Sequence, residues 1–118
     1  MKKARFFWKS TCTTCRAARS FLRNDLGVDL DERDYAKNPL SEAEIFALFD
    51  DAGLDPRDFL NPRSPAYKAM GLGDRKLTAP EAVTLMARNV NLIKRPLLVA
   101  GKTVIAGFDR DRLRAALS

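Results

Sequence analysis

The chain contains no histidine and only two cysteines among its 118 residues. The lack of histidine excludes nucleophiles activated in Cys-His or Ser-His pairs. Two cysteines without histidine cannot build a tetrahedral zinc site within one chain, and no group of carboxylates has metal-ligand spacing. We therefore expect no metal and no bound cofactor. Any thiolate here must be stabilised by a helix terminus, an arginine or a lysine.

Long hydrophobic runs are also missing. No segment approaches the roughly 20 consecutive apolar residues that a membrane-spanning helix needs. The basic start is followed by an apolar stretch of only Phe6-Phe7-Trp8, which is too short for the core of a signal peptide. We expect a cytoplasmic protein with no membrane partner. In that compartment a close cysteine pair is more often catalytic or redox-sensing than a structural disulfide.

The two cysteines form a Cys-x-x-Cys motif, Cys12-Thr13-Thr14-Cys15, where an apolar strand is expected to end and a helix to begin. The free N–H groups of a helix's first turn favour an anion, and therefore the thiolate. The first thiol would face solvent as the nucleophile and the second would resolve the adduct by forming a redox-active disulfide. The alternative is a pair of small residues that simply pack in the core.

Positive charge is concentrated near this motif in the sequence. The chain has 21 Lys and Arg against 15 Asp and Glu, a net charge of +6. Residues 1–25 hold seven basic residues and one acidic residue, and the remaining residues sum to zero. We expect this excess to surround the cysteines, to lower a thiol pKa and to attract an anionic substrate. The alternative is a solvated basic face with weak affinity for nucleic acid, although interleaved exposed aromatic residues are not evident.

Hydrophobic patterning predicts an α/β fold of one domain spanning residues 1–118. The strands at 4–8 and 28–34 should pair in parallel through the helix between them, which Gly27 ends. The third and fourth strands should form a hairpin around Gly101-Lys102. The predicted order is a strand at 4–8, a helix at 13–26, a strand at 28–34, a helical insert at about 41–90, strands at 97–100 and 103–106, and a last helix capped by Asp109.

The helical insert carries two capping boxes, Ser41 with Glu44 and Thr78 with Glu81. It is too small for us to expect a separate domain with its own core. Four residues are expected to form the inner face of its first helix: Ile45, Phe46, Leu48 and Phe49. A phosphate-binding loop at Gly101-Lys102-Thr103 is rejected because the motif's first glycine would fall on Pro96.

Several motifs together resemble the ArsC family of thioredoxin-fold arsenate reductases and their relatives, the Spx regulators. The resemblance covers nearly the whole chain. It rests on five stretches: Cys12-Thr13-Thr14-Cys15-Arg16, the helical insert, Asn61-Pro62-Arg63 followed by Tyr67, Leu92-Ile93-Lys94-Arg95-Pro96, and Gly107-Phe108-Asp109-Arg110-Asp111. It implies a thioredoxin-like fold, β-α-β followed by β-β-α, with the insert between the second and third strands.

The resemblance also implies roles for individual residues. Cys12 aligns with the nucleophile of the reductases and Arg16 with the arginine of their anion loop. Arg63 and Arg95 align with two arginines that hold the oxyanion, and Pro96 aligns with the cis-proline of the fold. Two departures look like Spx: Cys15 stands where glutathione-coupled reductases have serine, and Gly107-Phe108 stands where a third arginine is expected.

Two functions follow from this resemblance. The first is a thiol oxidoreductase acting on an oxyanion or a glutathione-linked substrate, with glutathione, glutaredoxin or thioredoxin as reductant. The second is a redox-sensing transcriptional regulator that binds the α subunit of RNA polymerase and does not bind nucleic acid directly. Oxidation-dependent partner binding without turnover would distinguish the second function from the first.

Overall fold

The computed structural model describes residues 3–117. The chain divides into two compact units. We call them the sheet unit, which comprises the residues up to Asn38 and from Arg95 onward, and the helical unit, which comprises Pro39–Lys94. The single domain expected from the sequence stays a prediction, and each unit is described by itself.

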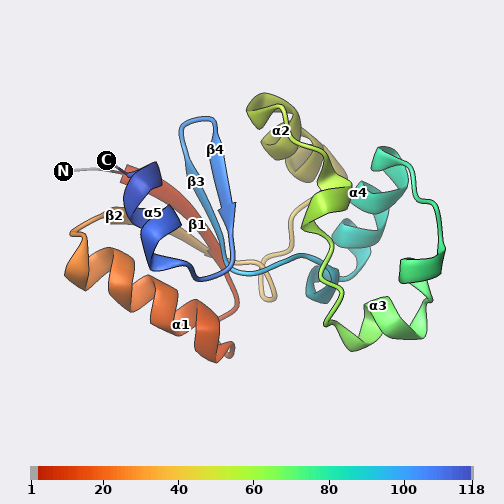
Figure 1. Cartoon of the computed structure of the whole chain (residues 1–118), viewed down its shortest axis with the longest axis horizontal. Helices are drawn as coiled ribbons and strands as arrows, with labels where there is room; N and C mark the ends of the chain where they lie inside the picture. The colour runs from red at the N-terminus through yellow and green to blue at the C-terminus, as the bar shows by residue number, and fades with distance from the viewer. Residues whose placement is uncertain (1–2, 118) are drawn as a thin grey trace. The chain divides into compact units, whose positions relative to one another are not determined.

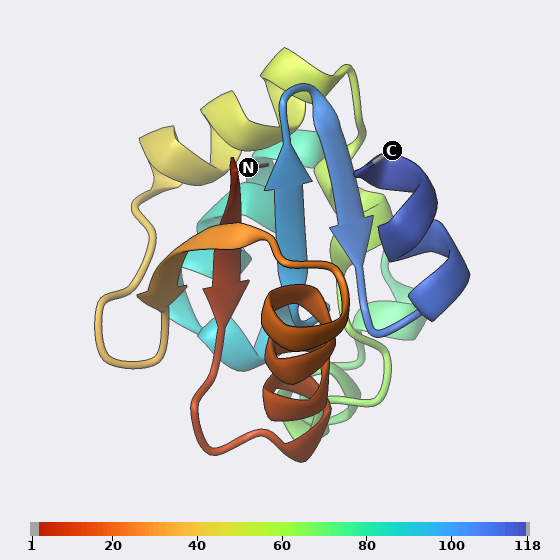
Figure 2. The same ribbon diagram turned by 90° about the vertical axis from the view of Figure 1, so that its left-hand side faces the viewer.

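The sheet unit contains a four-stranded sheet in the order β2-β1-β3-β4 (Figure 2). Its strands are β1 (Lys3–Trp8), β2 (Asp29–Asp34), β3 (Leu97–Ala100) and β4 (Thr103–Ala106). β1 pairs with β2 in parallel, so that Trp8 lies opposite Asp34, and it pairs with β3 in antiparallel fashion. β3 and β4 form the expected hairpin. The predicted parallel pairing of the first two strands and the predicted hairpin of the last two are therefore confirmed.

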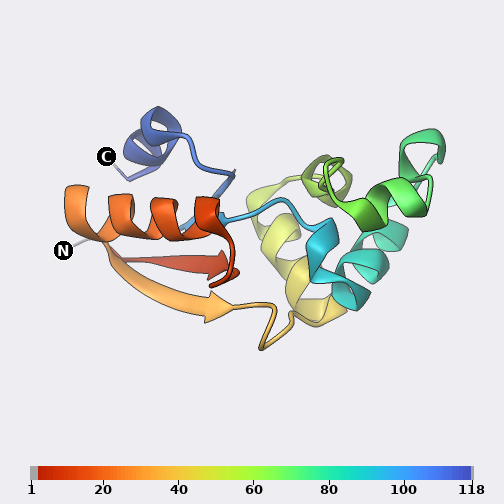
Figure 3. The ribbon, with the colours of Figure 1, turned by 90° about the horizontal axis from the view of Figure 1, so that it is seen from below.

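Two helices cover one face of this sheet (Figure 3). α1 (Thr13–Ser20) continues into a π-helical turn (Phe21–Asp25), and α5 (Arg110–Ala116) begins after Asp109, whose carboxylate accepts from the Arg112 N–H. Gly27 has a positive φ of 64° after the helix end, as its predicted role requires. The core between sheet and helices consists of Ala4, Phe6, Ala18, Phe21, Leu22, Val28, Leu30, Leu98, Ile105, Leu113 and Leu117.

The helical unit is built from α2 (Glu42–Ala52), α3 (Pro65–Ala69) and α4 (Ala79–Arg88) (Figure 1). Short 3₁₀ turns at Pro56–Phe59, Leu72–Asp74 and Val90–Leu92 complete it. Both predicted capping boxes are present, because each hydroxyl accepts from the backbone of the third helical residue and that residue's carboxylate accepts from the cap N–H. No helix in the described part of the chain has the length and apolar character to span a bilayer.

One core prediction is wrong. Phe46 is 56% exposed, whereas Ile45, Leu48 and Phe49 are buried. A helix turns about 100° per residue, so the three buried positions lie on one face of the helix and Phe46 lies outside that face. An apolar residue at that position therefore faces away from the contact between α2 and α4.

Candidate functional site

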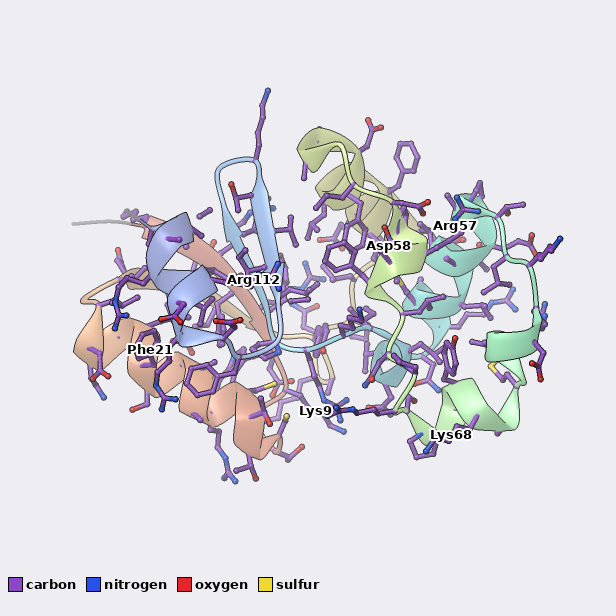
Figure 4. The ribbon with its side chains drawn as sticks, in the orientation of Figure 1. Lys9, Phe21, Arg57, Asp58, Lys68 and Arg112 are labelled. Atoms are coloured by element: carbon purple, nitrogen blue, oxygen red, sulfur yellow. The ribbon has the colours of Figure 1, made fainter. Side chains whose placement is uncertain are left out.

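Cys12 lies in the sheet unit, at the N-cap of α1, and its backbone is extended with φ −88° and ψ 121°. The loop before it leaves the end of β1 and contains Lys9, which is labelled in Figure 4. The Cys12 N–H donates to the Lys9 carbonyl over 2.9 Å, and the Cys12 carbonyl accepts from the Arg16 N–H over 3.0 Å. This turn presents the Cys12 side chain, which is partly exposed, at the start of the helix.

The surroundings of Cys12 favour its thiolate. Partial burial raises the pKa of Cys12, but hydrogen bonding from the Cys15 backbone and thiol, and the Arg95 guanidinium, together lower it below its ordinary value. The Cys12 side chain forms no ordinary N-cap hydrogen bond. The Cys15 N–H nevertheless lowers the pKa of Cys12, which is the effect expected of a helix N-terminus. A lowered pKa makes Cys12 the more nucleophilic sulfur near neutral pH.

Cys15 is in the opposite state. It is fully buried in the first turn of α1. Burial, the hydrogen bond to Cys12 and the negative charge of Cys12 raise the pKa of Cys15 to about 12. Both residues are free thiols in the structure. The pair therefore combines an accessible sulfur that ionises readily with a buried neighbour that keeps its proton.

Arg95 and Pro96 also belong to the sheet unit, although they lie far from the two cysteines in sequence. They directly precede β3, and the peptide bond between them is cis, as the family resemblance implied. The Pro96 carbonyl accepts from the Gly107 N–H over 2.8 Å, which ties this segment to the end of β4. Arg95 is half-buried, and its positive charge favours the thiolate of both cysteines. At Cys15 this effect is smaller than the effect of burial, which raises the pKa. Contact of Pro96 with a substrate stays a prediction.

The expectation that the N-terminal charge excess surrounds the cysteines is wrong in its details. Lys3 pairs with Asp29 at the far end of β1, and Arg19 and Arg23 both pair with Glu32 on β2. These charges are neutralised within the sheet unit because β2 carries acidic residues beside α1 and β1. Arg95, which is distant from Cys12 in sequence, lowers the pKa of Cys12.

The two other arginines assigned to anion binding are both exposed. Arg16 lies in the first turn of α1, directly after Cys15. Arg63 lies in the helical unit, where its backbone N–H donates to the Asn61 side-chain oxygen over 3.1 Å. Their roles in anion binding stay predictions. Among residues 3–117, no three cysteine or acidic side chains gather as ligands for a metal ion.

Sequence reasoning missed an anchor at the end of β2. The Asp34 carboxylate accepts from the Ser10 backbone N–H over 3.2 Å and from the Ser10 hydroxyl over 2.6 Å. Partial burial opposes ionisation, but these hydrogen bonds and those from Ala36 and Lys37 lower the pKa of Asp34. Asp34 thus fixes the loop that carries Cys12. The sequence signal was weak, because a strand ending in an acidic residue is common.

Comparison with known proteins identifies relatives of this chain. The model of the ArsC family matches residues 7–116. YusI, an uncharacterized protein of Bacillus subtilis (strain 168), is 34% identical over 109 residues, which cover 91% of this chain and 92% of YusI. The global transcriptional regulator Spx of Streptococcus pyogenes serotype M1 is 30% identical over 112 residues, which cover 95% of this chain and 83% of Spx.

A solved structure agrees with these sequence matches. It is described as a possible arsenate reductase from Streptococcus mutans UA159. It superposes with a TM-score of 0.75 at 36% identity and covers 89% of this chain and 90% of its own. The thioredoxin-like fold expected from the sequence is therefore confirmed by the sheet topology and by this likeness.

Proposed function

Because the chain belongs to the ArsC family, we propose that it is a thiol-dependent oxidoreductase with Cys12 as nucleophile and Cys15 as resolving thiol. The observation that carries this proposal is the opposite shift of the two pKa values, lowered for Cys12 and raised for Cys15. A nucleophile must be ionised and accessible, whereas a resolving thiol must stay protonated until an adduct has formed.

The proposed reaction has two thiol steps. The Cys12 thiolate attacks an oxidised sulfur, whose S–S bond breaks and releases a thiolate, or an oxyanion such as arsenate, which loses one oxygen as water with protons from solvent. Either attack leaves a covalent adduct on Cys12. Cys15 then loses its proton to solvent and attacks the Cys12 sulfur, forming the disulfide and releasing the substrate reduced by two electrons. Glutathione, glutaredoxin or thioredoxin returns two electrons to the disulfide.

Arginines provide the charge that this chemistry requires. Arg95 already acts on the cysteines in the structure. Arg16, Arg63 and Arg95 are proposed to bind the anionic substrate and to stabilise the charge that develops on its leaving group. A guanidinium suits this role because its planar set of donors matches two oxygens at once.

The activated nucleophile is tested by alkylating Cys12 across a range of pH and identifying the modified residue by mass spectrometry. We expect Cys12 to titrate below the value of about 8.5 that is typical of a free cysteine. A midpoint at or above that value would overturn the proposal. The Cys15→Ser variant serves as the matched control, because it leaves Cys12 as the reactive thiol.

Turnover measurements distinguish a dithiol mechanism from a single-thiol mechanism. Reduction of arsenate is measured with glutathione and glutaredoxin in the wild-type protein, Cys12→Ser and Cys15→Ser. Loss of activity in both variants supports the dithiol route. Loss in Cys12→Ser alone favours a single-thiol route in which glutathione replaces Cys15. Activity that survives in Cys12→Ser contradicts both routes.

The likeness to Spx supports a second candidate, a redox-sensing transcriptional regulator. The chain covers 83% of the S. pyogenes protein and has a cysteine pair whose oxidation could switch binding. The proposed partner is the α subunit of RNA polymerase. Capture of that subunit by reduced and by oxidised protein tests this role. Binding in neither state would exclude it, and oxidation-dependent binding without turnover would favour it over the enzyme.

A further inference from the structure

The peptide group between Lys9 and Ser10 joins the end of β2 to Cys12. Its N–H, which belongs to Ser10, donates to the Asp34 carboxylate over 3.2 Å. Its carbonyl, which belongs to Lys9, accepts from the Cys12 N–H over 2.9 Å. A peptide group is planar and rigid, so these two hydrogen bonds fix the Cys12 backbone relative to Asp34.

Both oxygens of the Asp34 carboxylate take part in this connection. Oδ2, which binds the Ser10 N–H, also accepts from the Ser10 hydroxyl over 2.6 Å. Oδ1 accepts from the Ala36 N–H over 3.1 Å, which holds the carboxylate against the turn that follows β2. A side chain with a single acceptor oxygen could satisfy only one of these two sides.

The preceding peptide group, between Trp8 and Lys9, repeats the arrangement. Its carbonyl accepts from the Tyr35 N–H over 3.0 Å. Burial raises the pKa of Cys15, and hydrogen bonding from the Lys9 backbone opposes that rise. The end of β2 therefore holds two successive peptide groups, and each of them acts on one cysteine of the motif.

The backbone of Cys12 sets where its sulfur lies, because the side chain is a single CH₂ group with the sulfur attached. The Cys12 N–H is bound to Lys9, and the Cys12 carbonyl accepts from the Arg16 N–H over 3.0 Å. These bonds hold the extended φ of −88° and ψ of 121° at the N-cap of α1. Partial burial opposes the thiolate, but in this position Cys15 and Arg95 favour it.

We propose that Asp34 is a positioning residue for the nucleophilic step, which acts through the Lys9–Ser10 peptide group to hold the Cys12 sulfur at the start of α1. The inference rests on the proposed function of Cys12. Without the carboxylate, the Lys9–Ser10 peptide group can rotate and its carbonyl can leave the Cys12 N–H. Cys12 should then ionise at higher pH and react more slowly near neutral pH.

The charge of Asp34 and its positioning role have opposite effects on Cys12. A nearby negative charge disfavours a thiolate, so loss of the charge alone would lower the pKa of Cys12, whereas loss of position would raise it. Partial burial opposes ionisation of Asp34, but its hydrogen bonds keep the pKa of this carboxyl below its ordinary value. Asp34 therefore stays ionised at neutral and alkaline pH, and the direction of the Cys12 shift separates the two effects.

Three other ionisable groups interact with Cys12. Cys15 of α1 and Arg95 before β3 favour its thiolate, against partial burial. Tyr35 keeps its proton, because burial raises the pKa of its phenol far above the usual range. None of these groups is removed by the substitutions that test the proposal.

The experiment measures alkylation of Cys12 by iodoacetamide in the full-length protein across the neutral and alkaline range. The Cys12 thiolate displaces iodide and forms a thioether, which mass spectrometry assigns to the residue. In Asp34→Ala we expect the rate near neutral pH to fall by about tenfold, as one unit of pKa gives, and to recover at alkaline pH. Asp34→Asn removes the same charge but keeps one acceptor oxygen, so it should shift the profile less.

Two further variants complete the test. Ser10→Ala removes the hydroxyl but keeps the peptide N–H, so the rate near neutral pH should fall by only about threefold. Asp29→Ala is the matched control, because Asp29 lies at the other end of β2, where it pairs with Lys3 over 3.8 Å. Its profile should overlay that of the wild-type protein. Circular dichroism checks that each variant is folded.

Each result bears on one of the two proposals or on both. A wild-type midpoint at or above about 8.5 overturns the activation of Cys12, and the role of Asp34 with it. A low wild-type midpoint that Asp34→Ala leaves unchanged or lowers overturns only the role of Asp34. Equal shifts in Asp34→Ala and Asp34→Asn also overturn it, because hydrogen bonding would then not matter. If the Asp34 variants do not fold, an unchanged profile in Ser10→Ala overturns the role instead.

Discussion

At the scale of single residues, the electrostatics of the candidate site depend on Arg95, whose positive charge acts on both cysteines. Arg95 lowers the pKa of Cys12 and also opposes the burial that raises the pKa of Cys15. It is half-buried, so solvent and salt screen it less than they screen the exposed Arg16 of α1. The pKa of Cys12 is thus tuned by a residue that lies 83 positions away along the chain.

We predict that Arg95→Ala raises the pKa of Cys12. The thiolate is present above the pKa and lost below it, so the variant should need a higher pH to reach the same alkylation rate. Near neutral pH the rate should fall by up to about tenfold, which corresponds to roughly one pKa unit, and it should recover at alkaline pH.

The matched control is Arg112→Ala, which removes an exposed arginine of α5. Its alkylation profile should overlay that of the wild-type protein. A profile for Arg95→Ala that also overlays the wild-type one would show that the helix terminus and Cys15 are sufficient to activate Cys12.

At the scale of secondary-structure elements, the helix starts show which local signals carry stability. The Thr78 hydroxyl accepts from the Glu81 N–H at the start of α4, and Ser41 does the same for α2. Ser64 occupies the corresponding position before α3 but makes no side-chain cap, and its buried hydroxyl is without a partner among the described residues. The same type of residue thus has different energetic roles at different helix starts.

We predict that Thr78→Ala lowers the free energy of unfolding by about 1 kcal/mol, the usual value of an N-cap hydroxyl. Ser64→Ala should be neutral or slightly stabilising, because it removes a buried polar group that has no partner. Denaturant unfolding monitored by circular dichroism measures both changes. An equal loss in the two variants would contradict the distinction between a satisfied cap and an orphan hydroxyl.

At the scale of the whole molecule, charge is divided unequally between the two parts of the chain. Residues 1–38 and 95–118 contain 14 basic and 7 acidic residues, whereas residues 39–94 contain 7 basic and 8 acidic residues. The sheet unit, which holds the cysteine pair, therefore carries an excess of seven positive charges. Such a field should concentrate anions near Cys12.

We predict that Cys12 reacts faster with an anionic aromatic disulfide than with a neutral one of similar intrinsic reactivity. The advantage should shrink as ionic strength rises from 0.01 to 1 M, because the Debye length falls from about 30 to about 3 Å. Stopped-flow rates with the two probes across that salt range measure the effect. A ratio that does not change with salt would show that the positive field does not steer substrates to the site.

Much of the fold could be predicted because its signals are local. The capping boxes of α2 and α4, the hairpin turn at Gly101 and the strand-to-helix position of Cys12 depend on neighbours in sequence. The exposure of Phe46 was not predicted, because the width of a buried helix face depends on the helix packed against it. The pairing of Arg19 and Arg23 with Glu32 was missed for a similar reason, since those partners lie on another element.

The sequence by itself determined the chemistry that is open to this protein. Two cysteines at a helix start, no histidine and a family pattern along the chain are what the proposed thiol reaction rests on. Only the tertiary structure decided that Arg95 acts on Cys12 and how deeply Cys15 is buried. The physical reason is that burial and charge act through space, and folding brings together residues that the chain keeps far apart.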